Sequence, residues 1–345
     1  MSEIVVGVTG LHSSDNPGPG VGVARSLKEA SDLNVRVVGL AYDAMETGLY
    51  LNQWVDHAFI IPYPSSGGNA LLERLRYIKA AVGLDVVTPT LDVELPLYAK
   101  LEQTLAEEGI RTFLPTAEQF RLRGKDRLVD VASAIGLHLP RTAVVSSIAD
   151  VQDALKEFSF PVMVKGVFYK AYRAYSATEA VGHALALAVE WGYPILLQEI
   201  ISGEELNVIA LGDGQGGCLG LVGMKKIWTT PLGKIWTGVT IRNEVMEAAA
   251  QKFIETYCWR GAFELECIVD GNKVYLIEIN PRFPSWCYFA TAVGVNLPAN
   301  LVRTALGRPA VSSQHFDAGR LYIRSIDERI IDMSIFQKMV TKGET

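Results

Sequence analysis

The chain has 345 residues, of which 49% are hydrophobic and 20% charged, and its formal net charge is −6. This is the composition of a globular protein long enough for two or three domains. The mildly acidic balance argues against general nucleic-acid binding and against attraction to anionic membranes. The N-terminus lacks the features of a signal peptide, and no apolar run reaches the roughly 18 residues of a membrane span. We therefore expect a cytoplasmic protein that binds neither nucleic acid nor membrane.

The first third of the chain alternates between short apolar runs and helical stretches. The runs cover residues 4–8, 35–40 and 85–88. Short apolar runs bounded by turns are typical of buried parallel strands. A helix is expected soon after residue 92, because leucines recur every fourth residue and Pro96 fits its first turn. Residues 1–120 are thus predicted to form an N-terminal α/β domain.

The next segment, residues 121–200, is predicted to be a small α+β unit. Its expected strands are residues 142–145, 161–165 and 195–199. Three residue pairs have the spacing of helix N-caps, in which a Ser or Thr side chain accepts from the backbone three residues on. They are Ser147 with Asp150, Ser176 with Glu179 and, just before the unit, Thr116 with Gln119.

Residues 201–310 have mainly the pattern of antiparallel strands separated by turns. One helix, residues 243–258, interrupts the strands, and a last helix is expected at residues 297–306. The tail, residues 311–345, holds a candidate strand at residues 321–323. We also regard the tail as a candidate homodimer contact.

The segment from residue 261 to residue 282 reads as two acidic strands joined by a turn. Strand side chains alternate between faces, so Glu264 and Glu266 share one face of the first strand. Glu278 and Asn280 share one face of the second strand for the same reason. An odd-membered loop between the strands would place Glu266 opposite Glu278, and Glu264 opposite Asn280.

Directly opposed carboxylates repel one another in a sheet, and burial would raise their pKa unless a cation lies between them. Carboxylate and amide oxygens are hard ligands of the kind that Mg²⁺ accepts, with Mn²⁺ as an alternative. A hairpin with a solvated acidic face is the competing interpretation. We favour the metal site, because Ile277 and Ile279 make the other face apolar and Pro281-Arg282 follows directly.

Three motifs together resemble the ATP-grasp superfamily. They are Leu-Ile-Glu-Ile-Asn-Pro-Arg at residues 276–282, Pro-Arg-Phe-Pro-Ser at 281–285 and Thr-Ala-Val-Gly-Val-Asn-Leu-Pro at 291–298. The chain looks most like the branch of carbamoyl-phosphate synthetase and biotin carboxylase, and like the amide ligase of pyrrolysine biosynthesis. The resemblance implies an ATP-grasp fold with an N-terminal α/β (pre-ATP-grasp) domain, a small lid subdomain and a β-rich core.

The resemblance also implies which residues hold magnesium and act on the reacting groups. The residues that match the metal ligands are Glu266, Glu278 and Asn280. Arg282 matches the arginine that faces the γ-phosphate and the acyl intermediate, with a structural ion pair as its alternative role. Strands that line the reaction centre in the family carry four further candidates: Lys225, Lys226, Thr237 and Arg242.

Other residues match the ATP-binding positions of the family. Lys125 and Lys165 match the two lysines that bind phosphate. The hinge that pairs with the adenine edge matches four consecutive residues: Gln198, Glu199, Ile200 and Ile201. Glu199 would accept from the exocyclic amine, and Glu205, or its neighbour Glu204, would bind the ribose. Leu265 is either an apolar wall for the adenine or a plain core residue.

Two stretches depart from the family pattern. Family members usually have a glycine-rich loop after the second lysine, whereas residues 166–175 contain one glycine, three tyrosines and the cations Lys170 and Arg173. Cradling of phosphate by backbone N–H groups is therefore less expected there. The Gln-Val-Glu-His-Pro run of biotin carboxylases is absent, which disfavours biotin carboxylation.

We therefore predict an ATP- and Mg²⁺-dependent carboxylate–amine ligase that acts through an acyl phosphate and releases ADP and phosphate. Its partners would be a small-molecule carboxylate and an amine, such as an amino acid or a peptide. The resemblance gives the N-terminal domain to the acceptor substrate, with loop residues His12, Ser13 and Asp15, and Thr90, Asp92 and Glu94, as candidate contacts. Two alternatives stay open: an enzyme that activates bicarbonate, and a non-catalytic ATP-binding regulatory protein.

Overall fold

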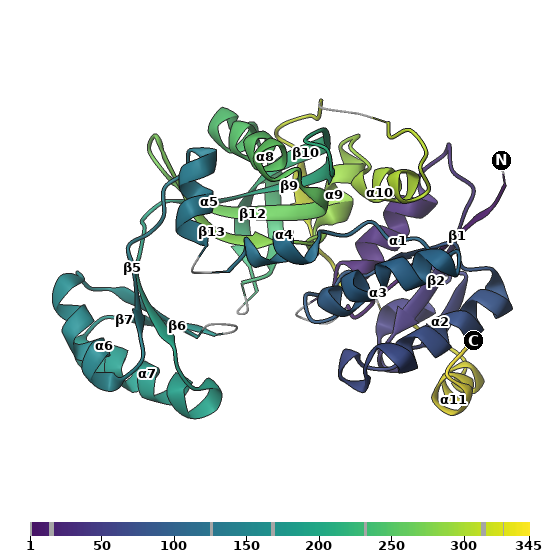
Figure 1. Cartoon of the computed structure of the whole chain (residues 1–345), viewed down its shortest axis with the longest axis horizontal. Coiled ribbons are helices and arrows are strands. Elements are labelled where there is room, and N and C mark those ends of the chain that lie inside the picture. Colours follow the sequence, from purple (N-terminus) through teal and green to yellow (C-terminus); the bar gives the residue numbers. More distant parts are fainter. Residues whose placement is uncertain are drawn as a thin grey trace. The chain divides into compact units, whose positions relative to one another are not determined.

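The chain folds into two compact units (Figure 1). The computed structural model describes residues 2–13, 17–124, 127–166, 170–230, 233–311, 315–326 and 328–345. The larger unit comprises Met1–Gly124, Leu206–Glu266 and Glu278–Thr345. The smaller unit comprises Lys125–Glu205 and Cys267–Ile277, so the chain passes back and forth between the two.

The larger unit begins with a four-stranded parallel sheet in the order β3-β2-β1-β4. Its strands are β1 (Ile4–Val8), β2 (Val35–Ala41), β3 (His57–Ile60) and β4 (Val86–Thr88). The helices of this part are α1 (Gly20–Lys28), α2 (Gly68–Val82) and α3 (Leu95–Glu107), with 3-10 turns at Thr47–Tyr50 and Pro64–Ser66. The predicted N-terminal α/β fold is confirmed.

The core of this sheet explains which strands the sequence reveals. All five residues of β1 are buried, as expected for a parallel strand covered on both faces. Pro96 lies in the first turn of α3, and Tyr98 of that helix is fully buried. We did not predict β3, because a four-residue run that begins with His57 is too short and too polar to stand out.

The second part of the larger unit is a six-stranded sheet in the order β13-β12-β9-β10-β11-β14. The strands are β9 (Glu204–Asp213), β10 (Cys218–Thr229), β11 (Ile235–Thr240), β12 (Arg260–Asp270), β13 (Lys273–Asn280) and β14 (Leu321–Ile323). The pairs β9–β10, β10–β11 and β11–β14 are antiparallel. The accompanying helices are α4 (Ala117–Arg121), α8 (Glu244–Tyr257), α9 (Cys287–Ala292) and α10 (Leu297–Ala305). The expected antiparallel core and its two helices are confirmed.

The turn of the acidic hairpin differs from the prediction. Strand β12 ends at Asp270 and β13 begins at Lys273, so only Gly271 and Asn272 separate them. Gly271 has φ 57°, a left-handed conformation that glycine adopts without steric cost. The predicted odd-membered loop is therefore wrong, and the pairing of Glu266 with Glu278 that it implied stays a prediction.

The C-terminal tail packs on its own chain at two places. Strand β14 pairs with β11, which confirms the candidate strand. After α11 (Met333–Lys342), Ile60 N donates to Gly343 O at 2.8 Å and Thr345 N donates to Ala58 O at 3.1 Å. The last residues thus lie along β3, and a homodimer contact by the tail stays a prediction.

The smaller unit is built on a four-stranded antiparallel sheet in the order β5-β8-β6-β7. Its strands are β5 (Thr142–Val145), β6 (Val162–Gly166), β7 (Ala171–Ala174) and β8 (Ile195–Glu199), and its helices are α5 (Leu128–Ile135), α6 (Ile148–Ala154) and α7 (Ala177–Trp191). Helices α6 and α7 lie together on one side of the sheet (Figure 1). Val162 and Val164 are buried in the core that includes these helices, so Met163 and Lys165 point to the opposite face.

The predicted helix starts are largely confirmed. Thr116 and Gln119 form a complete capping box, with both hydrogen bonds present. Ser147 and Ser176 each accept a hydrogen bond from the backbone three residues on, at 3.1 and 3.3 Å. The Glu179 carboxylate, however, accepts from Tyr175 N rather than from Ser176 N, so this box closes one residue earlier than predicted.

The glycine-poor stretch is partly a strand. Strand β7 pairs with β6, and Tyr172 on β7 stacks on His183 with 4.8 Å between ring centroids. Lys170 Nζ lies 2.7 Å from both carboxylate oxygens of Glu190, so a carboxylate of the same unit already neutralises this cation. Residues 167–169 lie outside the described part of the chain.

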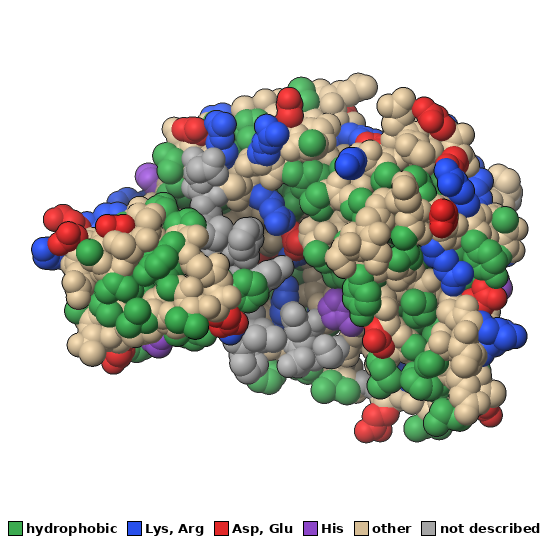
Figure 2. All heavy atoms as spheres, turned by 60° about the horizontal axis from the view of Figure 1, so that its bottom comes forward, with side chains coloured by type: hydrophobic (Ala, Val, Ile, Leu, Met, Phe, Trp, Pro, Cys, Tyr) green, Lys and Arg blue, Asp and Glu red, His purple; other side chains and the backbone are tan. Residues whose placement is uncertain are grey.

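The surface of the molecule is mixed. Figure 2 shows apolar side chains gathered on the smaller unit, at the left. The exposed apolar residues of this unit include Val144, Tyr175 and Val189. Among the helices in the described ranges, none has both the length and the apolar character that crossing a bilayer requires.

Candidate functional site

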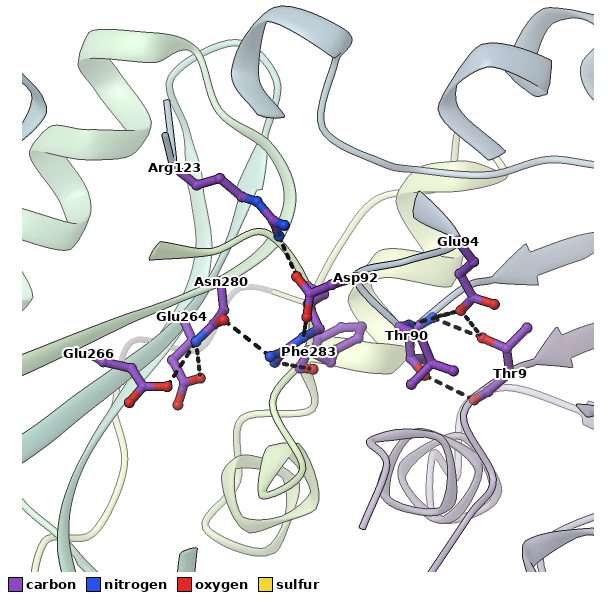
Figure 3. A network of polar contacts seen from close by, with 11 residues as sticks. Thr9, Thr90, Asp92, Glu94, Arg123, Glu264, Glu266, Asn280 and Phe283 are labelled. Carbon is purple, nitrogen blue, oxygen red and sulfur yellow. Dashed lines mark hydrogen bonds and ion pairs between the residues drawn. The ribbon is translucent and has the colours of Figure 1, made fainter. Parts of the chain in front are cut away.

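Neighbouring strands of the six-stranded sheet carry the acidic residues. Strand β12 contributes Glu264 and Glu266, which share a face because they are two residues apart. Asn280 at the end of β13 donates from Nδ2 to Glu264 Oε2 at 3.1 Å and to Glu266 Oε1 at 2.9 Å. One amide group therefore bridges both carboxylates (Figure 3).

Glu264 is buried and surrounded by neutral donors. Its exposed fraction is 3%, and its Oε1 accepts from Asn207 Nδ2 and from Trp286 Nε1, both at 2.7 Å. A buried carboxylate needs such donors, because the hydration that it loses must be replaced. Asn207 lies on β9 and Trp286 directly before α9, so Glu264 ties three parts of the core together.

Glu266 is more accessible, and it pairs with a cation. Its side chain is 27% exposed, and Lys226 Nζ lies 2.8 Å from Oε2. Lys226 comes from β10, and its own side chain is 11% exposed. Charge-assisted hydrogen bonds of this kind are stronger than neutral ones, so the Lys226–Glu266 pair fixes the acidic edge of the sheet.

The two carboxylates differ in their electrostatics. Burial raises the pKa of Glu264, and the neighbouring Glu266 carboxylate raises that pKa further. Burial would also raise the pKa of Glu266, but Lys226 and Arg282 hold it below the ordinary value. Glu266 is therefore the more readily ionised member of the pair.

Arg282, two residues after Asn280, extends the network to the N-terminal sheet. Its Nη2 donates to Asn280 Oδ1 at 3.1 Å, and its Nε donates to Asp92 Oδ2 at 2.7 Å. Asp92 also accepts from Arg123 (Figure 3). Burial would raise the pKa of Asp92, but Arg282 and Arg123 together hold it below the ordinary value. The network thus runs from β12 to the loop that follows β4.

A second buried carboxylate, Glu94, fixes that loop. Its Oε1 accepts from Thr90 N at 2.7 Å, from Leu91 N at 2.8 Å and from the Thr9 hydroxyl. Its Oε2 accepts from the Tyr42 hydroxyl. Glu94 is fully buried, and burial raises its pKa. The carboxyl ends of β1 and β4 are therefore joined to one buried side chain.

A lysine that the sequence analysis did not single out faces the same charges. Lys234 lies directly before β11, and burial, followed by the positive charge of Arg282, lowers its pKa. The carboxylates of Glu264, Glu266 and Asp92 act on this pKa in the opposite direction. Lys234 thus adds a second ammonium group to the centre that Lys226 and Arg282 already make cationic.

The donor set is compatible with Mg²⁺ or Mn²⁺. Carboxylate and amide oxygens suit these hard cations, and Glu264, Glu266 and Asn280 bring both kinds together. In the described part of the chain, no three His, Cys, Asp or Glu side chains are grouped so that they could hold a metal by themselves. Mg²⁺ usually takes only one or two carboxylates and completes its shell with water and phosphate oxygens. The residues therefore fit a metal that is bound together with a phosphate ligand.

The smaller unit brings two predicted nucleotide-binding residues together. Lys165 Nζ donates to Gln198 Oε1 at 2.6 Å, and Gln198 Nε2 donates to Thr142 Oγ1 at 2.9 Å. The three residues lie on adjacent strands β6, β8 and β5. They form a polar row across the face of the sheet opposite α6 and α7. The predicted phosphate lysine Lys125 lies outside the described residues.

The predicted hinge follows the end of β8. Glu199, the last residue of that strand, donates from its backbone N to Arg141 O at 2.9 Å, and its side chain accepts from Arg141 N at 2.6 Å. Ile200 and Ile201 are half-buried in the connection to β9, and Glu205 is exposed on β9. The Glu199 side chain is therefore already bound to backbone within its own unit.

The structure places the remaining predicted residues on β10, β12, β13 and the segment before α8. Arg242 makes a two-point contact with Glu247 at 2.9 and 2.6 Å and stacks on Phe316 at 4.6 Å, which favours a structural role. Lys225 is half-buried on β10, and Leu265 is fully buried on β12. Glu278 is exposed on β13, two residues before Asn280. Of the predicted metal and reaction-centre residues, Lys226, Glu266, Asn280 and Arg282 share the network.

Sequence reasoning left several members of this network without a role in it. Glu264 could have been included, because it shares a strand face with Glu266. Asp92 was considered only as a substrate contact, and nothing in its local sequence indicates an arginine 190 residues away. Asn207 and Trp286 are single residues in apolar surroundings, so no local pattern distinguishes them.

Comparison with known proteins identifies proteins that are similar in sequence or in fold. A family model described as "ATP-grasp in the biosynthetic pathway with Ter operon" matches residues 193–326. The chain is 26% identical over 179 residues to the phosphoribosylamine–glycine ligase of Mycobacterium leprae (strain TN), covering 45% of this chain and 41% of that protein. The chain therefore spans less than half the length of this curated relative.

Two solved structures have a similar fold. One is the biotin carboxylase domain dimer of 2-oxoglutarate carboxylase from Hydrogenobacter thermophilus, in complex with MgADP, ADP and bicarbonate (TM-score 0.67, 20% identity, 92% of this chain and 73% of that one). The other is the L-amino acid ligase of Bacillus licheniformis (TM-score 0.61, 18% identity, 88% of this chain and 74% of that one). With its parallel N-terminal sheet, small antiparallel sheet and large antiparallel core, the chain has the ATP-grasp fold, and its residues 193–326 are similar to an ATP-grasp family.

Proposed function

We propose that this protein is an ATP- and Mg²⁺-dependent carboxylate–amine ligase that forms ADP. A carboxylate oxygen of one substrate attacks the γ-phosphorus of ATP, and the bond from that phosphorus to the bridging oxygen breaks to release ADP. The amine nitrogen of the second substrate then attacks the acyl carbon of the resulting acyl phosphate. The carbon–oxygen bond to phosphate breaks, the nitrogen loses a proton, and an amide and inorganic phosphate result.

One observation carries this proposal: Asn280 joins two carboxylates to an arginine at the end of neighbouring strands. Its amide contacts Glu264 and Glu266 on one side and Arg282 on the other. A site for phosphoryl transfer needs oxygen ligands for a metal beside fixed positive charge, because catalysis consists mainly of positioning and charge neutralisation. The solvated acidic hairpin that we weighed as the alternative would not bury Glu264 to 3% exposure.

The metal would be held by Glu266, Glu278 and Asn280, with Glu264 as a further candidate ligand. When bound, Mg²⁺ would supply positive charge that neutralises the charge developing on the phosphate during transfer. Side chains of the protein would supply the other positive charges. Arg282 would donate to the transferring phosphoryl group, and Lys226 and Lys234 would keep the surroundings cationic.

ATP itself would be bound by the residues that match the nucleotide-binding positions of the ATP-grasp family. Lys165 and Lys125 would bind phosphate, and the hinge from Gln198 to Ile201 would pair with the adenine edge. Glu205 would bind the ribose, and Leu265 would contact the base. We assign Lys225 to substrate or phosphate only loosely, and we give Arg242 no part in the reaction, because Glu247 and Phe316 occupy its guanidinium group.

The substrates would be a small carboxylic acid and an amine, such as an amino acid or a peptide. Two similar proteins, a phosphoribosylamine–glycine ligase and an L-amino acid ligase, support this class. Neither name identifies the acid or the amine for this chain.

The test is an ADP-release assay with MgATP over pairs of amino acids, peptides and other small acids and amines. We expect ADP release that requires both an acid and an amine, with amide product detected by mass spectrometry. ADP release that needs bicarbonate but no organic acid would instead favour bicarbonate activation. Magnesium-dependent ATP binding by calorimetry without ADP from any pair would favour a non-catalytic ATP-binding protein, and the ligase proposal would fail.

A further inference from the structure

Arg282 is held on three sides. Its Nε donates to Asp92 Oδ2 at 2.7 Å, its Nη2 to Asn280 Oδ1 at 3.1 Å and its Nη1 to Phe283 O at 3.3 Å. The side chain is 11% exposed. A guanidinium group has five N–H donors in a rigid plane. Within the described residues, these three contacts leave two donors for an anionic ligand.

The contact with Asp92 sets the direction of the guanidinium plane. The Phe283 carbonyl is the neighbouring backbone, and Asn280 lies only two residues away on the same strand end, so both move with Arg282. Asp92 is the one partner that comes from a distant part of the chain, 190 residues away. A planar fork anchored at Nε by a carboxylate presents its remaining donors in a fixed direction.

The loop that carries Asp92 is itself rigidly attached. Two residues further on, Glu94 is fully buried and accepts from Thr90 N and Leu91 N at 2.7 and 2.8 Å. Thr90 Oγ1 donates to Thr9 O at 3.0 Å, which ties the loop to the end of β1 (Figure 3). Asp92 is therefore presented from a fixed scaffold rather than from a free loop.

Asp92 also separates two like charges. Its other carboxylate oxygen accepts from Arg123, so one carboxylate lies between two guanidinium groups. Without that negative charge, Arg123 and Arg282 would repel each other across a partly buried site. Arg282 would then move away from Arg123, and its contact with Asn280 would loosen.

We propose that Asp92 is a positioning residue that holds the Arg282 guanidinium in the orientation needed to meet the transferring phosphoryl group. This inference rests on the ligase function proposed above. Asp92 touches neither substrate nor metal in this role, and it acts through Arg282. The N-terminal sheet thereby contributes directly to the geometry of the reaction centre in the β-rich core.

The test is a double-mutant cycle with Asp92→Asn and Arg282→Lys in the full-length protein. We expect Asp92→Asn to lower kcat about 10- to 100-fold, since misplacing a reacting group by about 1 Å can cost about 100-fold. The KM for ATP should change less than about threefold, because Asp92 does not contact the nucleotide. In the Arg282→Lys background, which lacks the Nε donor, Asp92→Asn should lower kcat by less than about twofold more.

A second measurement reports on the side chain without activity. In the wild type, the Nε–H signal of Arg282 in a ¹H–¹⁵N spectrum should be protected from solvent exchange, and Asp92→Asn should weaken that protection, because a neutral amide oxygen is a poorer acceptor than a carboxylate. Asp317→Asn removes a surface carboxylate that pairs with Arg320 at 2.8 Å, and it serves as the matched control, with both kcat and the Arg282 signal unchanged.

Two results would overturn the inference while leaving the ligase function intact: near-wild-type kcat in Asp92→Asn, or an equal loss in the wild-type and Arg282→Lys backgrounds. If the wild type forms no ADP from any acid and amine, the proposed function fails and this inference falls with it. A thermal melt of each variant separates these outcomes from simple unfolding.

Discussion

Two acidic sites lie within the larger unit, one at Glu94 and one at Glu266, and their carboxylates accept hydrogen bonds from different kinds of donor. Glu94 is enclosed by hydroxyl groups and backbone N–H groups, and no cation contacts it in the described residues. Glu266 is 27% exposed and contacts Lys226 and the Asn280 amide. Both sites are drawn in Figure 3.

The difference separates a structural carboxylate from one suited to chemistry. Neutral donors around a fully buried group stabilise one conformation and leave no room for a ligand. A carboxylate that is partly exposed, kept ionised by cations and bonded to a side-chain amide can exchange those partners for a metal and a phosphate. We therefore expect substitutions at Glu94 to affect stability first, and substitutions near Glu266 to affect activity first.

The largest expected effect is on turnover in Glu266→Gln. Removing the negative charge should lower the rate of ADP formation about 100- to 1,000-fold, the scale on which electrostatic groups act in catalysis. The free energy of unfolding should fall by only about 1 kcal/mol. The single amide oxygen of Gln can accept from Asn280 or from Lys226 but not from both, and at this 27% exposed site water can accept from the other donor. Steady-state kinetics and urea denaturation measure the two quantities. Glu73→Gln, at an exposed position on α2, is the control. Normal turnover in the Glu266 variant would show that Glu266, like Glu94, has no role in the chemistry.

Glu278→Ala tests how far the chemical site extends along β13. The side chain is exposed, so its loss should leave the melting temperature almost unchanged. If Glu278 is a metal ligand, turnover should fall about 100-fold, and magnesium-dependent ATP binding should weaken in calorimetry. Full activity in this variant would remove Glu278 from the metal site and leave Glu264 as the second carboxylate.

Glu94→Gln should act on the fold. An amide NH₂ group would face the N–H groups of Thr90 and Leu91 or the Tyr42 hydroxyl, so at least one buried donor would lose its acceptor. The expected loss is about 1–3 kcal/mol in the free energy of unfolding, measured by urea denaturation at neutral pH. A variant with wild-type stability but impaired turnover would reverse the roles that we assign to the two sites.

The smallest effect is the pH dependence of stability in Asp92→Asn. The pKa of Asp92 is lower in the folded protein than in the unfolded chain, so its ionised form stabilises the fold above its ordinary pKa. The variant should be about 1 kcal/mol less stable than the wild type at neutral pH. This difference should vanish as the pH falls through the lowered pKa of Asp92, because the wild-type carboxylate is then neutral too. Parallel urea denaturation curves across acidic pH measure it; a constant difference at all pH values would show that the charge is not responsible.

The elements with strong local patterns could be predicted from the sequence. The apolar runs of β1, β2 and β4, the helices that became α8 and α10, and the Thr116 cap are all specified by residues close in sequence. Strand β3 and the pairing of Gly343–Thr345 along it depend on contacts over long sequence distances, so no short window predicts them. The two-residue turn of the hairpin was missed because local composition does not fix loop length.

The candidate site was predictable to a similar degree. Glu266, Asn280 and Arg282 lie in one acidic segment, residues 261–282. The alternation of side chains along its two strands already predicts that they lie near one another. Asp92 and Lys234 join them only because the chain folds back, and their residue types are common on surfaces. The local sequence therefore predicts the central residues of the network, whereas Asp92 and Lys234 can be identified only from the folded structure.

The acidic hairpin belongs to both units: its base, with Glu266 and Glu278, lies in the larger one, and its tip, Cys267–Ile277, in the smaller one. His138 attaches the tip through two backbone hydrogen bonds of 2.8 Å, to Val274 and from Leu276. A fragment of residues 125–205 would therefore lack Val274 and Leu276, the hydrogen-bond partners of its His138 backbone. Neither unit is a single continuous stretch of polypeptide. Because both units contain part of the hairpin, a substitution that destabilises one unit should also lower the stability of the other.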